Sequence, residues 1–245
     1  MVALNAGKVR FEVDAVIFDK DGTLIDLDVS WAAPGRAWID AASGGDAPLW
    51  CELAAALGFD GEAGRLVPDG VMAAGTLDEL DRHTRMVLVE VGLGEEAVDH
   101  RVDLARRVAI ESALRVEGIP TLGDVAAGFR RLAAAGVLLG VVTSDDRAVA
   151  EALLVAIGVE HLVRRVVGGD DDIAPKPSPD GILAVCGDAG VDPARTLMVG
   201  DSTADLLAAR NAGLAGFVAV GADSPAAAGA DAVVASIDDL SIVSD

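Results

Sequence analysis

The chain has few of the residues from which many kinds of site are built. Tyrosine is absent, aromatic residues make up 3% of the 245 residues, and there are only two cysteines and three histidines. Two isolated cysteines cannot form a disulfide framework, and no cysteine–histidine cluster has metal-binding spacing. We expect Cys51 and Cys186 to be buried free thiols. With so few aromatic rings, the core must be packed mainly by aliphatic side chains.

Positive charge is also scarce. The 19 lysines and arginines face 40 aspartates and glutamates, which gives a net charge of −21. This balance argues against a nucleic-acid partner and against an anionic membrane surface, because both repel negative charge. No apolar run approaches the ~20 residues of a membrane span. The first residues also lack the pattern of a signal peptide, so we expect a cytoplasmic protein.

What the chain does contain is an apolar run that stops on two carboxylates. Asp19 and Asp21 directly follow residues 16–18, and Gly22 and Thr23 come next. Residues two apart in a strand share one side, and a turn after the strand can bring the second carboxylate over the first. A carboxylate attacks a phosphoester only when their charges are offset, so the pattern predicts a divalent cation. The second carboxylate is then available for proton transfer.

Two further polar clusters are typical of phosphate binding. Thr143 and Ser144 end an apolar run, where a hydroxyl beside a helix N-terminus suits a phosphate oxygen. Alternatively, Ser144 simply caps a helix over residues 148–157. Lys176 is one of three lysines and stands between two prolines, which restrict its backbone. The alternative for Lys176 is a solvated surface residue.

The last polar cluster again follows an apolar, strand-like run. Asp201 comes after residues 197–200, and Asp205 lies near the start of a helix that extends to residue 213. Asp205 is then either part of a metal site or a residue that stabilises the dipole of the helix from its first turn. Four polar clusters at strand ends, in this order, are very unlikely to arise by chance.

Together these clusters resemble the motifs of the haloacid dehalogenase-like hydrolases. The segment Asp19–Leu24 resembles the nucleophile motif of that family, Asp-x-Asp-Gly-Thr. The resemblance covers nearly the whole chain, although its motifs occupy only residues 16–24 and 137–211. It implies an α/β fold: a Rossmann-like parallel-sheet core domain, with an inserted α-helical cap domain.

The coarse pattern of the chain agrees with that architecture. Strand-like runs with helical stretches between them end at residues 18, 142, 167, 199, 220 and 234. Between them lies a segment without a clear strand, where helices are predicted over residues 49–57, 76–92 and 95–117. We therefore expect the cap to comprise residues 27–118 and the core to comprise residues 1–26 and 119–245.

The resemblance also implies a mechanism. Asp19 would attack phosphorus and carry the phosphoryl group as an aspartyl phosphate. Asp21 would protonate the leaving oxygen and later deprotonate the attacking water. Thr143 or Ser144, together with Lys176, would hold the phosphoryl oxygens.

The same resemblance implies a Mg²⁺ site. Mg²⁺ would be held by Asp19, by Asp201 and by the backbone carbonyl of Asp21. Asp205 would act through a water molecule or as the partner of another ligand. Lys20 departs from the apolar residue that is more familiar between the two carboxylates. Strand alternation predicts that its side chain points away from both, as a bystander.

The substrate is expected to be a small phosphorylated metabolite. Asp21 favours phosphoryl chemistry over dehalogenation, and the absence of lysine from residues 28–117 argues against a phosphonatase. A phosphoglycolate phosphatase-like enzyme is the preferred interpretation, and a sugar-phosphate mutase is the alternative. Arg36 and Trp31, near the entry to the cap, are candidates for substrate specificity; otherwise Arg36 is a solvated helix residue and Trp31 packs the hinge.

Two interpretations outside enzymology use the same residues. A signalling receiver domain also combines a phosphoacceptor aspartate with a metal site, a hydroxyl and a lysine. It has no large helical insertion, however, and its phosphoacceptor lies after its acidic pair rather than on the first strand. A binding protein on an inactive scaffold is disfavoured because no motif residue is missing. The sequence leaves the oligomeric state undetermined.

Overall fold

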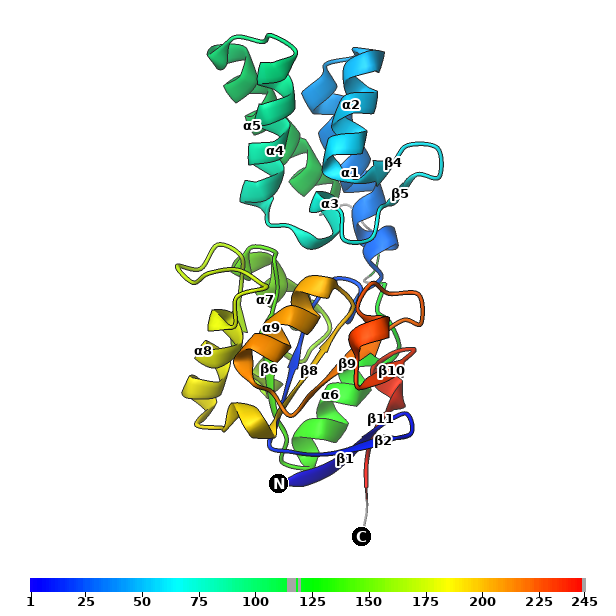
Figure 1. Ribbon diagram of the computed structural model, residues 1–245, viewed down its shortest axis with the longest axis vertical. Coiled ribbons are helices and arrows are strands. Elements are labelled where there is room, and N and C mark those ends of the chain that lie inside the picture. The colour runs from blue at the N-terminus through cyan, green and yellow to red at the C-terminus, as the bar shows by residue number, and fades with distance from the viewer. Residues whose placement is uncertain (114–117, 119, 244–245) are drawn as a thin grey trace. The chain divides into compact units, whose positions relative to one another are not determined.

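The chain divides into two compact units (Figure 1). The computed structural model describes residues 1–113, 118 and 120–243. The core unit consists of Met1–Asp26 and Thr121–Asp245, and the cap unit consists of Leu27–Pro120. The return to the core that the sequence predicts at residue 119 lies outside the described residues.

A parallel six-stranded sheet forms the centre of the core unit. Its strand order is β10-β9-β8-β3-β6-β7, so β3 lies between β8 and β6 and pairs with both in parallel. The predicted α/β fold with a Rossmann-like sheet is thereby confirmed. Five predicted strand ends coincide with the observed ones, and β8 continues one residue further. The strands are β3 (Ala15–Phe18), β6 (Leu138–Val142), β7 (Val163–Val167), β8 (Thr196–Gly200), β9 (Gly216–Val220) and β10 (Ala232–Val234).

Helices cover both faces of this sheet. Alternation along β3 turns Phe18 to one face, where its ring centroid lies 5.0 Å from that of Phe129, and turns Ile17 to the other face, against Ile182. All four of these side chains are fully buried, and each such burial stabilises the fold by about 1.5–3 kcal/mol. The helices of the core unit are α6 (Val125–Ala134), α7 (Arg147–Ala156), α8 (Asp180–Ala189) and α9 (Thr203–Ala212), with short 3₁₀ turns η1 (Glu160–Leu162), η2 (Pro193–Arg195), η3 (Ala227–Gly229) and η4 (Ile237–Asp239).

A second, antiparallel sheet of the core unit was not predicted from the sequence. Its order is β11-β1-β2, with β1 (Val2–Ala6), β2 (Val9–Val13) and β11 (Leu240–Ile242). Leu4, Phe11 and Leu240 point inward from these strands and join the same apolar cluster as Phe18. The small sheet therefore extends the core on the face that α6 covers.

The cap unit is mainly helical. Thr76 caps α4 with a complete capping box to Glu79, as the sequence predicts. The predicted end of the next helix at residue 117 lies outside the described residues. The expectation of no strand here is wrong, because β4 and β5, which have two residues each, pair as a short antiparallel hairpin. The elements are α1 (Leu27–Ser43), α2 (Ala47–Leu57), β4 (Phe59–Asp60), β5 (Arg65–Leu66), α3 (Val71–Ala74), α4 (Leu77–Glu90) and α5 (Glu95–Ala113).

The two cysteines have different environments. Cys186 is buried on α8, with its Sγ 3.6 Å from Oγ1 of Thr196, as predicted. The prediction for Cys51 is wrong, because its position on α2 faces solvent. Within the part of the chain that the structure describes, no helix is both long and apolar enough to cross a bilayer.

Candidate active site

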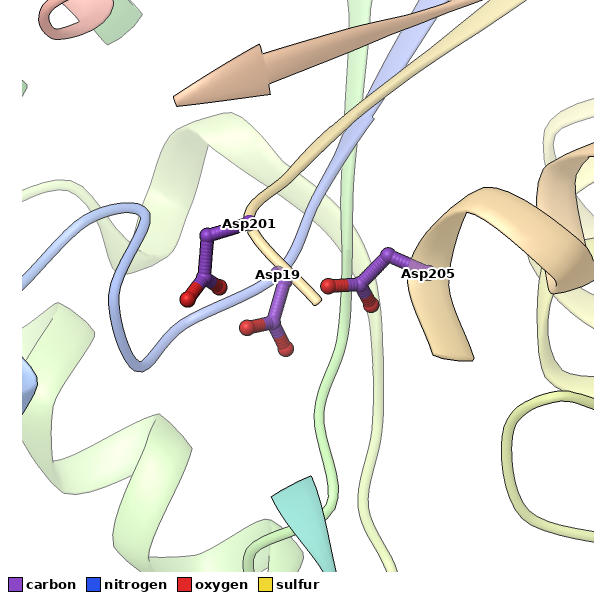
Figure 2. A group of neighbouring side chains, drawn as sticks. All are labelled: Asp19, Asp201 and Asp205. Atoms are coloured by element: carbon purple, nitrogen blue, oxygen red, sulfur yellow. The ribbon is translucent and has the colours of Figure 1, made fainter. Parts of the chain in front are cut away.

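Three carboxylates converge at the carboxyl edge of the parallel sheet. Asp19 follows β3, Asp201 follows β8, and Asp205 lies in the first turn of α9 (Figure 2). An oxygen from each lies within 4.8 Å of an oxygen from the others. The backbone N–H of Asp19 donates to the carbonyl of Val199 at 2.9 Å, which continues the β3–β8 pairing as far as Asp19. Parallel strands bring their carboxyl ends to one edge, where such sheets bind ligands.

Lys176 lies among these carboxylates. Its Nζ is 2.6 Å from Oδ1 of Asp19 and 2.7 Å from Oδ1 of Asp205, and its side chain is 5% exposed. Burial alone would lower the pKa of Lys176, but these two carboxylates hold the pKa above its usual range. Lys176 is therefore a buried cation beside Asp19, and the alternative of a solvated lysine does not apply.

The carboxylates repel one another in a buried site. Burial raises the pKa of Asp19 to about 7; Lys176 opposes this rise, and the neighbouring Asp205 adds to it. Burial, and then the charges of Asp19 and Asp205, raise the pKa of Asp201 to about 8. Negative charge thus exceeds what Lys176 compensates, which is the condition under which a cation binds with advantage.

Asp205 lies in the first turn of α9 and contacts both the start of this helix and Lys176. Its Oδ2 accepts hydrogen bonds from the backbone N–H and the hydroxyl of Ser202, at 3.1 and 2.7 Å, which completes a capping box at the start of α9. Its Oδ1 accepts from Lys176. Because both oxygens are engaged and the side chain is fully buried, Asp205 is suited to holding Lys176 and the helix in place.

The loop after β3 is shaped so that it fits over Asp201. Gly22 has a φ of +74°, in the left-handed region that favours glycine. An added Cβ at this position would collide with the carboxylate of Asp201. Thr23 donates from its hydroxyl to Oδ1 of Asp201 at 3.3 Å. Glycine at this position therefore leaves room for the carboxylate of Asp201 to approach the backbone of the loop.

Thr143 and Ser144 follow β6 at the same edge of the sheet. Thr143 is buried, and its hydroxyl accepts the backbone N–H of Asp145 at 3.2 Å. Ser144 is half-buried. The N-cap position of α7 is occupied by Asp146 rather than by Ser144. Both hydroxyl residues remain candidates for phosphate binding.

The expectation that Lys20 points away from both carboxylates is wrong. Its side chain is 3% exposed, and its Nζ lies 2.6 Å from Oδ2 of Asp21 and 2.8 Å from Oδ2 of Asp145. Alternation fails here because β3 ends at Phe18 and the chain is already turning. Asp145 was missed, although it directly follows Thr143 and Ser144 at the same sheet edge. The signal that would have found it is the lysine itself, because a buried lysine requires carboxylate partners.

Asp21 is accordingly held by a cation. Burial raises its pKa to about 6; Lys20 opposes this rise, and Asp145 adds to it. The pKa of Lys20 lies above its usual range because Asp21 and Asp145 outweigh the effect of its burial. A carboxyl with a pKa of about 6 can both donate and accept a proton near neutral pH.

The two specificity candidates lie within the cap unit. Trp31 is half-buried and packs against the apolar core of the cap. Arg36 is exposed: its guanidinium carbon lies 5.8 Å from the centroid of Trp50, and its Nε lies 3.9 Å from Oδ2 of Asp40. Arg36 lines a hollow of about 480 Å³ on the α1–α2 side of the cap. Their role in specificity stays a prediction.

The chain is similar to several known proteins. The model of the haloacid dehalogenase-like hydrolase family matches residues 13–213. A protein of Cupriavidus necator named "Phosphoglycolate phosphatase, plasmid" is 33% identical over 245 residues, which cover 95% of this chain and 93% of that protein. A crystal structure of a predicted phosphoglycolate phosphatase from Haemophilus somnus matches with a TM-score of 0.69 at 21% identity, covering 93% of this chain and 96% of the other. β-Phosphoglucomutase from Clostridium difficile matches with a TM-score of 0.65 at 18% identity, covering 92% of each chain. At these identities the structural matches show the fold alone.

The chain belongs to the haloacid dehalogenase-like hydrolases, since the family model spans most of its length. Within that family it is phosphoglycolate phosphatase-like, and the family together with these relatives supports a phosphoric monoester hydrolase. The family inferred from the four motifs is confirmed.

Proposed function

We propose that the chain is a Mg²⁺-dependent phosphatase that hydrolyses a small phosphomonoester through an aspartyl phosphate on Asp19. The observation that carries this proposal is the convergence of Asp19, Asp201 and Asp205 around Lys176 at the carboxyl edge of the sheet. A nucleophile, a set of hard oxygen ligands and a fixed cation are the parts that phosphoryl transfer requires.

The first step forms a bond between Asp19 and phosphorus. One carboxylate oxygen of Asp19 attacks while the bond from phosphorus to the leaving oxygen breaks, and Asp21 donates a proton to that oxygen. Lys176, 2.6 Å from Asp19, stabilises the charge on the phosphoryl oxygens together with Thr143 or Ser144.

The second step regenerates the nucleophile. Asp21, now ionised, takes a proton from a water molecule, which attacks phosphorus while the bond to Asp19 breaks. The products are inorganic phosphate and the free carboxylate of Asp19. A pKa of about 6 lets Asp21 serve in both directions near neutral pH.

The donor set fits a Mg²⁺ ion. Carboxylate oxygens are the ligands that Mg²⁺ prefers, and the three carboxylates carry more negative charge than Lys176 offsets. Asp19, Asp201 and the backbone carbonyl of Asp21 would hold the ion, with Asp205 acting through water. When bound, Mg²⁺ supplies positive charge that offsets the repulsion between the nucleophile and the phosphate.

Phosphoglycolate is the first candidate substrate. The relative from Cupriavidus necator is named for its action on this compound, and it aligns with nearly the whole chain. The core carboxylates address only the phosphoryl group, so discrimination between phosphomonoesters is assigned to the cap. Sugar-phosphate mutase activity is the alternative, and it would require the cap to grip a second phosphate.

The proposal is tested by the variant Asp19→Asn. Purified wild-type protein should release phosphate from p-nitrophenyl phosphate and from phosphoglycolate only when Mg²⁺ is present, and Asp19→Asn should lose nearly all of this turnover. Acid-quenched wild type should carry a hydroxylamine-labile phosphoryl group on the peptide that contains residue 19, detected by mass spectrometry.

The matched control is Asp172→Asn, which makes the same chemical change at an exposed position of the core unit. It should behave as wild type. Ordinary Mg²⁺-dependent turnover by Asp19→Asn would refute the mechanism. Isomerisation of a sugar phosphate that outpaces phosphate release would favour the mutase instead.

A further inference from the structure

Lys20 is a buried cation that no step of the proposed mechanism uses. Its Nζ contacts both carboxylate oxygens of Asp21, Oδ1 at 2.7 Å and Oδ2 at 2.6 Å, and also contacts Oδ2 of Asp145 at 2.8 Å. Lysine is almost never fully buried unless it is paired. Well-packed apolar residues often stabilise a core as well as a buried ion pair does, so stability alone does not account for this arrangement.

Asp145 holds the ammonium group of Lys20 on the side away from Asp21. The side chain of Asp145 is 12% exposed, and its backbone N–H donates to Oγ1 of Thr143 at 3.2 Å. Its carbonyl accepts the N–H of Gly169, in the loop after β7, at 2.7 Å. Asp145 is therefore anchored to two loops at the carboxyl edge of the sheet, and through Lys20 it is joined to the loop that carries Asp21.

The backbone holds Lys20 from the other direction. Its carbonyl accepts the N–H groups of Leu24 at 2.8 Å and Ile25 at 3.1 Å, which closes the turn after β3. The backbone from which the ammonium group of Lys20 extends is therefore fixed, and so is Asp145, which balances its charge. A carboxylate that offers both oxygens to one fixed donor loses most of its rotational freedom.

We propose that Lys20, held by Asp145, is a positioning residue that fixes the carboxyl group of Asp21 for proton transfer to the leaving oxygen. This inference rests on the proposed function, in which Asp21 is the acid and base. Orientation of a catalytic group matters at this scale, because a misplacement of about 1 Å can cost a hundredfold in rate.

Leaving groups of different basicity reveal such a role. Phenyl phosphate and p-nitrophenyl phosphate are nearly the same size, but phenolate is much the more basic leaving group and needs a proton, whereas p-nitrophenolate departs without one. The ratio kcat/KM reports events up to the first irreversible step, the transfer to Asp19. Loss of a well-placed acid should therefore lower kcat/KM for phenyl phosphate and spare p-nitrophenyl phosphate.

The test uses the double variant Lys20→Met/Asp145→Asn. Removing both charges keeps the net charge of the Asp21–Lys20–Asp145 group unchanged, whereas Lys20→Met alone would leave two carboxylates facing each other and would strongly destabilise the protein. We expect kcat/KM for phenyl phosphate to fall about tenfold to a hundredfold, less than the full span of about 10²–10⁴-fold for general acid catalysis because Asp21 itself is still present. The value for p-nitrophenyl phosphate should stay within about threefold. Lys8→Met, at an exposed position, is the control and should change neither.

A combination with Asp21→Asn shows whether Lys20 acts through Asp21. Asp21→Asn should produce the same selective loss, and adding Lys20→Met/Asp145→Asn to it should cause little further loss, because coupled residues are not additive. Equal losses on both substrates, or fully additive losses, would overturn the inference and leave a structural ion pair. No loss in a folded double variant would overturn it as well.

Failure of the inference and failure of the proposed function are distinguishable. If wild type turns over with Mg²⁺ and Asp21→Asn shows the selective loss, the proposed function stands whatever the Lys20 variant does. If wild type shows no Mg²⁺-dependent turnover of either ester, the proposed function fails, and this inference fails with it. Thermal unfolding of each variant confirms that folded proteins are being compared.

Discussion

Replacement of Lys176 by methionine should destabilise the protein substantially. Methionine keeps the apolar length of the side chain but removes the cation that lies 2.6 Å from Asp19 and 2.7 Å from Asp205. None of these three side chains is more than 8% exposed, so water cannot replace the lost charge. Breaking a buried ion pair from one side costs about 3–5 kcal/mol. For a chain of this size, that corresponds to a loss of about 6–20 °C in Tm.

The loss should depend on pH in a defined direction. The pKa of Asp19 is already raised to about 7, from an ordinary value of 3.8, and removal of Lys176 takes away a group that holds it down. Above pH 3.8 the folded variant therefore binds more protons than the unfolded chain, and its stability falls as the pH rises towards the folded-state pKa. At pH 5.5 a proton neutralises Asp19; at pH 8 the carboxylates stay charged and repel.

The assay is calorimetric unfolding of metal-free protein at pH 5.5 and pH 8. The Tm deficit of Lys176→Met relative to wild type should be larger at pH 8. Lys8→Met, which removes an exposed lysine, should unfold within about 2 °C of wild type at both values. An equally small deficit for Lys176→Met at pH 8 would refute Lys176 as the counter-charge of the site.

Four further outcomes are expected. Asp21→Ala should lower turnover about 10²–10⁴-fold but change Mg²⁺ affinity far less than Asp201→Ala does, by titration calorimetry. Stabilisation by Mg²⁺ should grow from pH 5.5 to pH 8 in thermal unfolding, because Asp19 and Asp201, with pKa values of about 7 and 8, must lose protons to bind it. Gly22→Ala should cost roughly 1–2 kcal/mol for its left-handed backbone and should lower turnover by displacing Asp201; unchanged turnover would contradict the close approach. Arg36→Ala should lower kcat/KM for phosphoglycolate about tenfold to a hundredfold and spare p-nitrophenyl phosphate, whereas equal effects would indicate a folding role.

Much of the core could be predicted because its signals are local. Each strand of the parallel sheet is a short apolar run, and the polar residue that follows it marks the carboxyl edge. Asp19 and Asp201 could be assigned on that basis, since parallel strands bring these positions together whatever the details of the loops. Lys176 lies in the long loop after β7 and was selected because it is one of three lysines and stands between two prolines. The roles of the other candidate site residues came from the resemblance to the family and from the order of its motifs.

Features that depend on pairing between distant segments could not be predicted. The contact of Lys20 with Asp145 joins two loops from different parts of the sequence, and strand alternation gives no guide once β3 has ended at Phe18. The antiparallel sheet was missed because β11, with three residues, has almost no pattern of its own and exists through its register with β1. The β4–β5 hairpin in the cap is shorter still.

The position of the cap within the chain has a consequence for biosynthesis. β3 carries Asp19, but its parallel neighbours β6 and β8 follow only after the whole of Leu27–Pro120. A ribosome therefore delivers a continuous helical unit, with an apolar core of its own, before β3 has acquired either neighbour. Domains generally fold as units while the chain is being made, and distant strand pairings form late. The cap can therefore be complete before the three carboxylates come together, because that group needs β8 and Asp201 to have emerged.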